Sequence, residues 1–129
     1  MDSEDTIRVI LAVGENRSLA GKLCQELDGR DGIVLAGELA GGEEMPAVAA
    51  ASADVLVVAG EAGADTARRL AEAVPGVPVV LITDNVIRDL VPAVKAGVAG
   101  LLPADVAGSD LIETIRRVHL WSGRSAALV

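Results

Sequence analysis

Five short runs rich in β-branched residues recur along the chain at nearly constant intervals. They are Ile7–Val13, Ile33–Ala36, Val55–Val58, Val77–Ile82 and Gly100–Leu102, and their starts lie 26, 22, 22 and 23 residues apart. Runs that are apolar almost throughout are typical of strands buried on both faces, as in a parallel sheet. The pattern therefore predicts strands that alternate with helices, and helices that cover both faces of one sheet.

Segments with the spacing of amphipathic helices lie between these runs. Their apolar stripes are Leu19, Leu23 and Leu27; Met45, Val48 and Ala49; Ala67, Leu70, Ala71 and Val74; and Leu111, Ile112, Ile115 and Val118. Glycines that fit the expected helix ends are Gly29, Gly32, Gly76 and Gly97. A leucine-rich solenoid of similar period is excluded, because its fixed pattern of Leu and Asn is missing. The predicted fold class is α/β with a five-stranded parallel sheet.

Two prolines refine the helix boundaries. Pro46 falls in the first turn of the second expected helix, where its missing N–H removes no hydrogen bond. Pro92 is expected to break a helix that starts at Asn85. The fourth helix is therefore predicted to begin near Asp89, with that carboxylate as N-cap, and to span about Leu90–Ala96.

Length and cysteine content set the class of chain. The 129 residues fit one domain, with residues 1–124 predicted to form the fold and 125–129 to begin a linker or tail. The single cysteine, Cys24, forms no internal disulfide, which favours a reducing compartment, and its place on an apolar stripe predicts an inert core residue. The longest apolar run is about six residues, far below the ~20 of a membrane helix. A cytoplasmic chain with no membrane contact is expected.

Charge and aromatic content exclude direct contact of this domain with nucleic acid. The formal net charge is −8, whereas phosphate binding needs clustered Lys and Arg. Trp121 is the only aromatic residue, so the platforms on which bases stack are missing. The Trp121 side chain, at the end of the last expected helix, is predicted to cover the core or to contact a later part of the protein.

The carboxyl ends of the strands are the expected place for function in an open α/β sheet. Four acids come after these ends and are either a weak cation or ligand edge or solvated loop residues: Glu15, Glu61, Asp84 and Asp105. The sequence contains no dinucleotide fingerprint, phosphate loop or nucleophile elbow. The only histidine, His119, lies in the last helix, where a partly exposed helix-end residue is expected. We therefore predict no enzyme activity, no metal and no cofactor.

Seven pieces of the chain occur in an order and spacing that characterise a known family. They are Ile7–Ala12, Gly37–Glu38, Gly42–Glu44, Ala53–Val55, Val80–Thr83, Lys95–Leu102 and Leu111–Val118. With them the chain, over about residues 6 to 124, resembles the receiver domains of bacterial two-component response regulators. The similar subfamily carries a DNA-binding domain of the NarL/LuxR type. The resemblance implies a flavodoxin-like (CheY-like) fold with strand order 2-1-3-4-5.

The chemistry of this family is not matched by the corresponding residues. A working receiver accepts a phosphoryl group on an Asp at the end of the third strand, and that position is Ala59 here. The acidic pair that holds magnesium corresponds to Val13 and Gly14, and the lysine after the fifth strand corresponds to Ala104. Only the hydroxyl of Thr83 matches. Because a methyl group is no nucleophile, the resemblance implies an atypical receiver that lacks the phosphoacceptor site.

The resemblance implies two alternative functions. The first is a phosphorylation-independent regulatory module that dimerises and controls a DNA-binding domain outside this chain. Its expected homodimer face is formed by the first and fifth helices, or by the fourth helix, fifth strand and fifth helix. The aromatic residue that the family uses as a switch on the fifth strand corresponds to Leu101. The alternative is a sensory module that binds a small molecule in the pocket lined by Val13, Ala59, Thr83 and Ala104.

Overall fold

The structure is a computed structural model that describes residues 7–13, 17–27, 32–40, 53–59, 63–73 and 76–128. The strands are β1 (Ile7–Val13), β2 (Ile33–Ala40), β3 (Val55–Ala59), β4 (Val79–Thr83) and β5 (Gly100–Pro103). The helices are α1 (Arg17–Leu27), α3 (Gly63–Ala73), α4 (Val86–Ala96) and α5 (Gly108–Leu128). The strands form one parallel sheet in the order β2-β1-β3-β4-β5, which confirms the predicted fold class.

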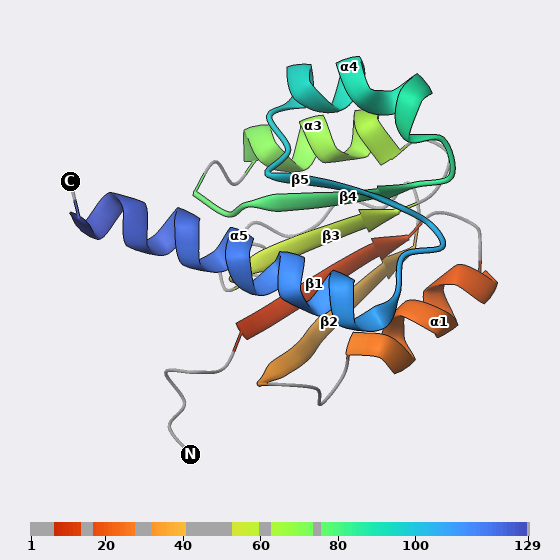
Figure 1. Ribbon diagram of the computed structural model, residues 1–129, viewed down its shortest axis with the longest axis horizontal. Coiled ribbons are helices and arrows are strands. Elements are labelled where there is room, and N and C mark those ends of the chain that lie inside the picture. The colour runs from red at the N-terminus through yellow and green to blue at the C-terminus, as the bar shows by residue number, and fades with distance from the viewer. Residues whose placement is uncertain are drawn as a thin grey trace.

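The helices cover both faces of the sheet (Figure 1). Helices α1 and α5 lie on one face, and α3 and α4 lie on the other. Successive side chains of a strand point to opposite faces. Val55 and Val57 of β3 accordingly pack with α1 and α5, whereas Leu56 and Val58 pack with α3 and α4. Burial on both faces is the physical reason for the continuous apolar runs of the sequence.

Most predicted elements are confirmed, with shifted ends. Strand β2 is longer than predicted and runs on to Ala40. Its pairing with β1 shifts by one residue on the way: Val9 pairs with Leu35, but the next residue, Ile10, pairs with Gly37. Strand β4 begins at Val79, because the preceding Pro78 has no N–H to give to a ladder. The predicted helix over Met45, Val48 and Ala49 lies outside the described residues, as do Gly29 and Val74.

The prediction for the fourth helix is wrong. Helix α4 begins at Val86 with Asn85 as its N-cap, whose side chain accepts a hydrogen bond from the Arg88 N–H at 2.9 Å. Pro92 lies inside the helix, and its side chain is exposed. A proline there leaves the carbonyl four residues earlier without its partner. The caps at both ends hold the helix together nevertheless, with Gly97 in the left-handed conformation (φ 79°) at its C-terminus.

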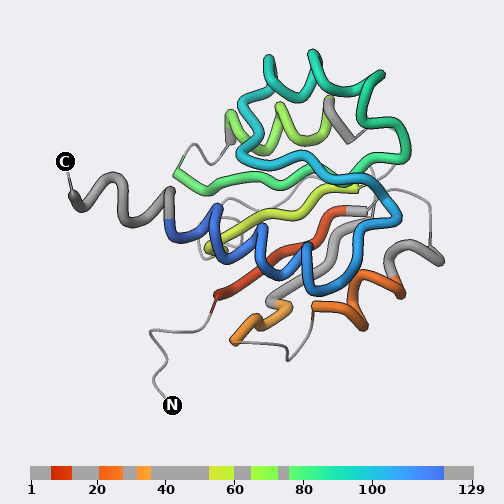
Figure 2. Tube along the Cα trace, in the orientation of Figure 1, coloured from red at the N-terminus to blue at the C-terminus, as the bar shows by residue number. Residues whose placement is uncertain are grey.

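Three residues singled out from the sequence lie on the α1/α5 side of the fold. His119 is partly exposed, as predicted. Cys24 is half-buried and packs against the core, and its predicted inertness stays a prediction. Helices α1 and α5 run beside each other on this side of the sheet (Figure 2). The predicted role of the Trp121 side chain lies outside what the structure describes. Helix α5 continues to Leu128, and the predicted domain boundary at residue 124 stays a prediction.

Candidate functional site

The predicted site positions meet at the carboxyl edge of the sheet. Val13 at the end of β1 pairs with Ala59 at the end of β3, and Ala59 pairs with the residue that precedes Thr83. The N–H of Ala104 donates to the Thr83 carbonyl at 2.8 Å. The structure therefore brings these four positions together. Three others lie outside the described residues, namely Gly14, Glu15 and Glu61.

Ala59 is part of the hydrophobic core. It is 3% exposed and packs with the residues that α1 and α5 cover. Its methyl group neither donates nor accepts a hydrogen bond and carries no ionisable proton. At the end of β3 the chain thus presents a buried methyl group, which supplies neither a nucleophile nor a metal ligand.

Helix α1 supplies a cation that the sequence analysis missed. The Lys22 Nζ donates to the carbonyl oxygen of Ala104 over 3.4 Å. One turn later, the Glu26 carboxylate occupies the space that a Cβ at Gly108 would need, at the start of α5. The spacing of four residues between Lys22 and Glu26 was the available signal, since it places both side chains on one helix face. Together they tie α1 to the β5–α5 connection.

The Thr83 hydroxyl makes two hydrogen bonds, one as donor and one as acceptor. Thr83 is 3% exposed, and its hydroxyl donates to the Asp89 carboxylate and accepts from the Asn85 N–H at 3.0 Å. Asp89 also accepts from the Arg88 guanidinium at 3.0 Å and 3.1 Å, and that guanidinium reaches Asp84 at 3.1 Å. Asp89 is therefore no N-cap: it joins the end of β4 to the first turns of α4.

The hydrogen bonds of this network shift the pKa values of Asp89 and Arg88. The Arg88 guanidinium, and after it the Thr83 hydroxyl, lower the pKa of Asp89 below its ordinary value of 3.8. The pKa of Arg88 is raised, first by its hydrogen bond to Asp89. Both charged forms are thus favoured in the folded state.

Replacing Thr83 by Val is expected to lower the free energy of unfolding by about 1–3 kcal/mol at neutral pH, because the Asn85 N–H and the Asp89 carboxylate each lose a partner. A lowered pKa of Asp89 stabilises the fold above the unfolded pKa and loses this effect as pH falls through the folded pKa. In Thr83→Val this acid-dependent loss should be smaller. Urea unfolding between about pH 6 and about pH 2 measures both effects.

Thr114→Val is the matched control for this substitution. Thr114 is half-buried in α5, and no hydrogen bond of its hydroxyl is found among the described residues. It should change stability by less than about 1 kcal/mol, with the acid dependence of the parent. An unchanged acid dependence in Thr83→Val would contradict the assignment of Asp89 as the group that Thr83 stabilises.

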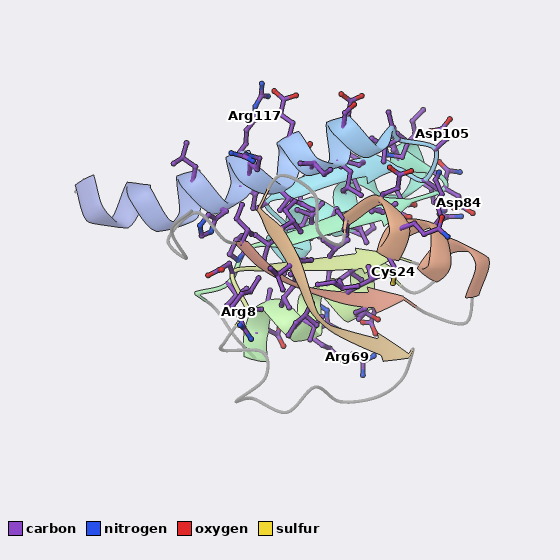
Figure 3. The ribbon with its side chains drawn as sticks, turned by 90° about the horizontal axis from the view of Figure 1, so that it is seen from below. Arg8, Cys24, Arg69, Asp84, Asp105 and Arg117 are labelled. Carbon is purple, nitrogen blue, oxygen red and sulfur yellow. The ribbon has the colours of Figure 1, made fainter. Side chains whose placement is uncertain are left out.

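The remaining candidate residues at this edge have ordinary surroundings. Asp84 and Asp105 are exposed and lie at the same end of the molecule (Figure 3). Leu101 is half-buried and packs toward α3 and α4.

Over the described parts of the chain, no three His, Cys, Asp or Glu side chains stand close enough together to hold a metal ion. None of the described helices is both long and apolar enough to cross a membrane.

Comparison with known proteins places the fold. No family model matches the sequence, and no curated protein is similar enough in sequence to count as a relative. Among solved structures, the response regulator ChrA of a heme-sensing two-component system is 28% identical with a TM-score of 0.72. The alignment covers 89% of this chain, which spans 57% of the ChrA chain.

Two further solved structures are single receiver domains. The CheY-like receiver from Methanospirillum hungatei JF-1 is 17% identical, with a TM-score of 0.71 and coverage of 93% of this chain and 99% of that one. The receiver of the putative NarL from Mycobacterium tuberculosis is 18% identical, with a TM-score of 0.69 and coverage of 89% and 97%. The fold is therefore that of the response-regulator receivers, including those of the NarL and LuxR types.

Proposed function

We propose that this chain is an atypical receiver, a regulatory module that works without phosphorylation. The observation that carries the proposal is the burial of Ala59 at the end of β3, where the resembling family keeps its phosphoacceptor aspartate. A buried methyl group offers no nucleophile to a phosphoryl donor. The hydroxyl of Thr83 supports the proposal, because Asp89 and the Asn85 N–H already use its donor and one of its acceptor sites.

The output of such a module is an interaction between proteins. We propose that it dimerises, through the α1–α5 face or the α4–β5–α5 face, and thereby controls an attached DNA-binding domain. The similarity to ChrA supports an attached domain, since this chain spans only 57% of that response regulator. The net charge of −8 argues that DNA contact belongs to another part of the protein. Placement in the cytoplasm and the absence of enzyme activity belong to the same proposal.

Incubation with acetyl phosphate and magnesium is expected to leave the mass of the chain unchanged. A receiver that retains its aspartate, treated in parallel, should gain one phosphoryl group and so prove the reagent active. A gain of one phosphoryl group by this chain would overturn the proposal. Mapping of that group to a glutamate would reveal a substitute acceptor.

The small-molecule alternative has no support from the described residues. Two of the four positions that were expected to line its pocket, Ala59 and Thr83, are each 3% exposed and offer a ligand little surface. A ligand that binds only the folded state raises the unfolding temperature by mass action. A metabolite that did so in this chain, and not in a variant with Ala59→Leu, would revive this function.

A further inference from the structure

Helix α4 carries its large apolar side chains on the solvent side. Ile87, Leu90, Val91 and Val94 are 88%, 50%, 59% and 68% exposed. The residues that α4 buries are alanines, Ala93 at 1% and Ala96 at 8% exposed. An amphipathic surface helix ordinarily turns its large apolar residues to the core. Contiguous exposed apolar patches on soluble proteins mark interaction surfaces.

The contacts at the start of α4 hold the helix in this orientation. At the end of β4, the Thr83 hydroxyl donates to the inward-facing Asp89 and accepts from the Asn85 N–H at the start of the helix. Rotation of the helix about its axis would bury the apolar stripe only by breaking both contacts. The stripe of Ile87, Leu90, Val91 and Val94 is therefore a fixed feature of the surface.

We propose that a second copy of this chain covers this stripe, with the two α4 helices packed antiparallel about a twofold axis. The spacing i, i+3, i+4, i+7 is unchanged when the direction of the helix is reversed. Ile87 of one copy therefore lies beside Val94 of the other, and Leu90 lies beside Val91. A twofold interface requires such self-complementarity. The inference rests on the proposed function and chooses between its two dimer faces.

Charge decides the direction of the pairing. At the start of α4, Asp84 and Asp89 surround Arg88, so this group has one negative charge in excess. At the other end Lys95 is exposed and has no ion-pair partner among the described residues. Antiparallel packing brings Lys95 of each copy to the acidic group of the other, and it also opposes the helix dipoles favourably. Parallel packing would place like charges together.

The other large exposed apolar side chains among the described residues are isolated. Leu120 on α5 is 49% exposed, and Val34 on β2 is 42% exposed. Single exposed apolar residues are normal on a protein surface. The described part of the α1–α5 face thus lacks an apolar stripe of its own, and α4 is the better dimer face. A stable interface buries roughly 800 Å² per partner, so surface beside α4 must also take part.

Charged substitutions in the stripe test the face. Ile87→Asp and Val94→Asp are each expected to weaken self-association at least about tenfold, measured by sedimentation over a wide range of protein concentration. Both side chains are more than two-thirds exposed, so circular dichroism should report an unchanged fold. Leu120→Asp is the matched control and should leave the dimer intact. A parent chain that stays monomeric, or a dimer that only Leu120→Asp dissociates, would overturn the proposal.

Cysteine pairs test the direction. In a Cys24→Ala background, the double variant Ile87→Cys/Val94→Cys should form a disulfide between copies under mild oxidation. Seven residues of helix separate these positions by about 10.5 Å, so a disulfide within one copy is ruled out. Ile87→Cys alone should remain a thiol, because antiparallel packing keeps the two copies of this position apart. Efficient dimerisation of that single variant would indicate parallel packing and overturn the antiparallel model.

The outcomes separate this proposal from the proposed function. A dimer that Ile87→Asp leaves intact would remove α4 from the interface without touching the claim that the module needs no phosphate. A phosphoryl group taken from acetyl phosphate would remove the proposed function, while the cysteine pairs would still report how the two copies pack.

Discussion

Replacing Leu111 by Ala is expected to lower the free energy of unfolding by about 3–5 kcal/mol. Leu111 lies in the first turn of α5, is 1% exposed and packs with α1 and the sheet. Its truncation removes apolar contacts and leaves a cavity that neighbouring side chains fill only in part. Such a loss is a large fraction of the stability of a domain of this size. Urea unfolding followed by circular dichroism measures the change.

The same substitution at Leu120 is the matched control. Both leucines belong to α5, so helix propensity changes equally, but Leu120 is 49% exposed. Leu120→Ala should cost less than about 1 kcal/mol. Equal costs at the two positions would mean that α5 does not pack on the sheet through Leu111.

Replacing Pro92 by Ala is expected to raise the free energy of unfolding by about 1–3 kcal/mol, measured by urea unfolding. The proline sits inside α4, where its nitrogen gives no hydrogen bond and its ring crowds the preceding turn, at a cost of about 3 kcal/mol. Alanine supplies the missing N–H to the carbonyl of Arg88 and has the highest helix propensity. Because the Pro92 side chain is exposed, its loss leaves no cavity.

Pro78→Ala should change stability in the opposite direction. Pro78 precedes β4 outside any helix, and its carbonyl accepts the Leu56 N–H at 2.9 Å, a bond that alanine keeps. Its replacement mainly frees the unfolded chain, which is expected to cost about 0.4–1 kcal/mol. A destabilised Pro92→Ala would imply that the proline fits α4 without strain.

The strands were predictable because their signal is local. Burial on both faces of a parallel sheet selects apolar residues at every position of a strand, as β3 and β4 display. The strand order came from the resemblance of the ordered pieces to a known family, and the ladder pairings confirm it. The registers that gather Val13, Ala59 and Thr83 at one edge depend on that order.

The start of α4 and the surroundings of the candidate site were less predictable. Asp89 and Asn85 are both good N-caps by residue type, and Pro92 favoured the later start. In the structure Asp89 bonds to the Thr83 hydroxyl at the end of β4, and the helix starts earlier, at Val86, with Asn85 as its N-cap. Likewise, the approach of Lys22 to Ala104 joins residues that are 82 positions apart in the chain.

The sequence by itself determined the alternation of strands and helices, and with it the apolar residues at the candidate edge, because these depend on each residue's own type and periodicity. The tertiary structure decided which way α4 turns. Its apolar stripe has the right spacing to face a core, but the Asp89–Thr83 contact and the buried alanines direct the stripe to solvent. That choice depends on contacts between separate elements, which periodicity within one helix cannot specify.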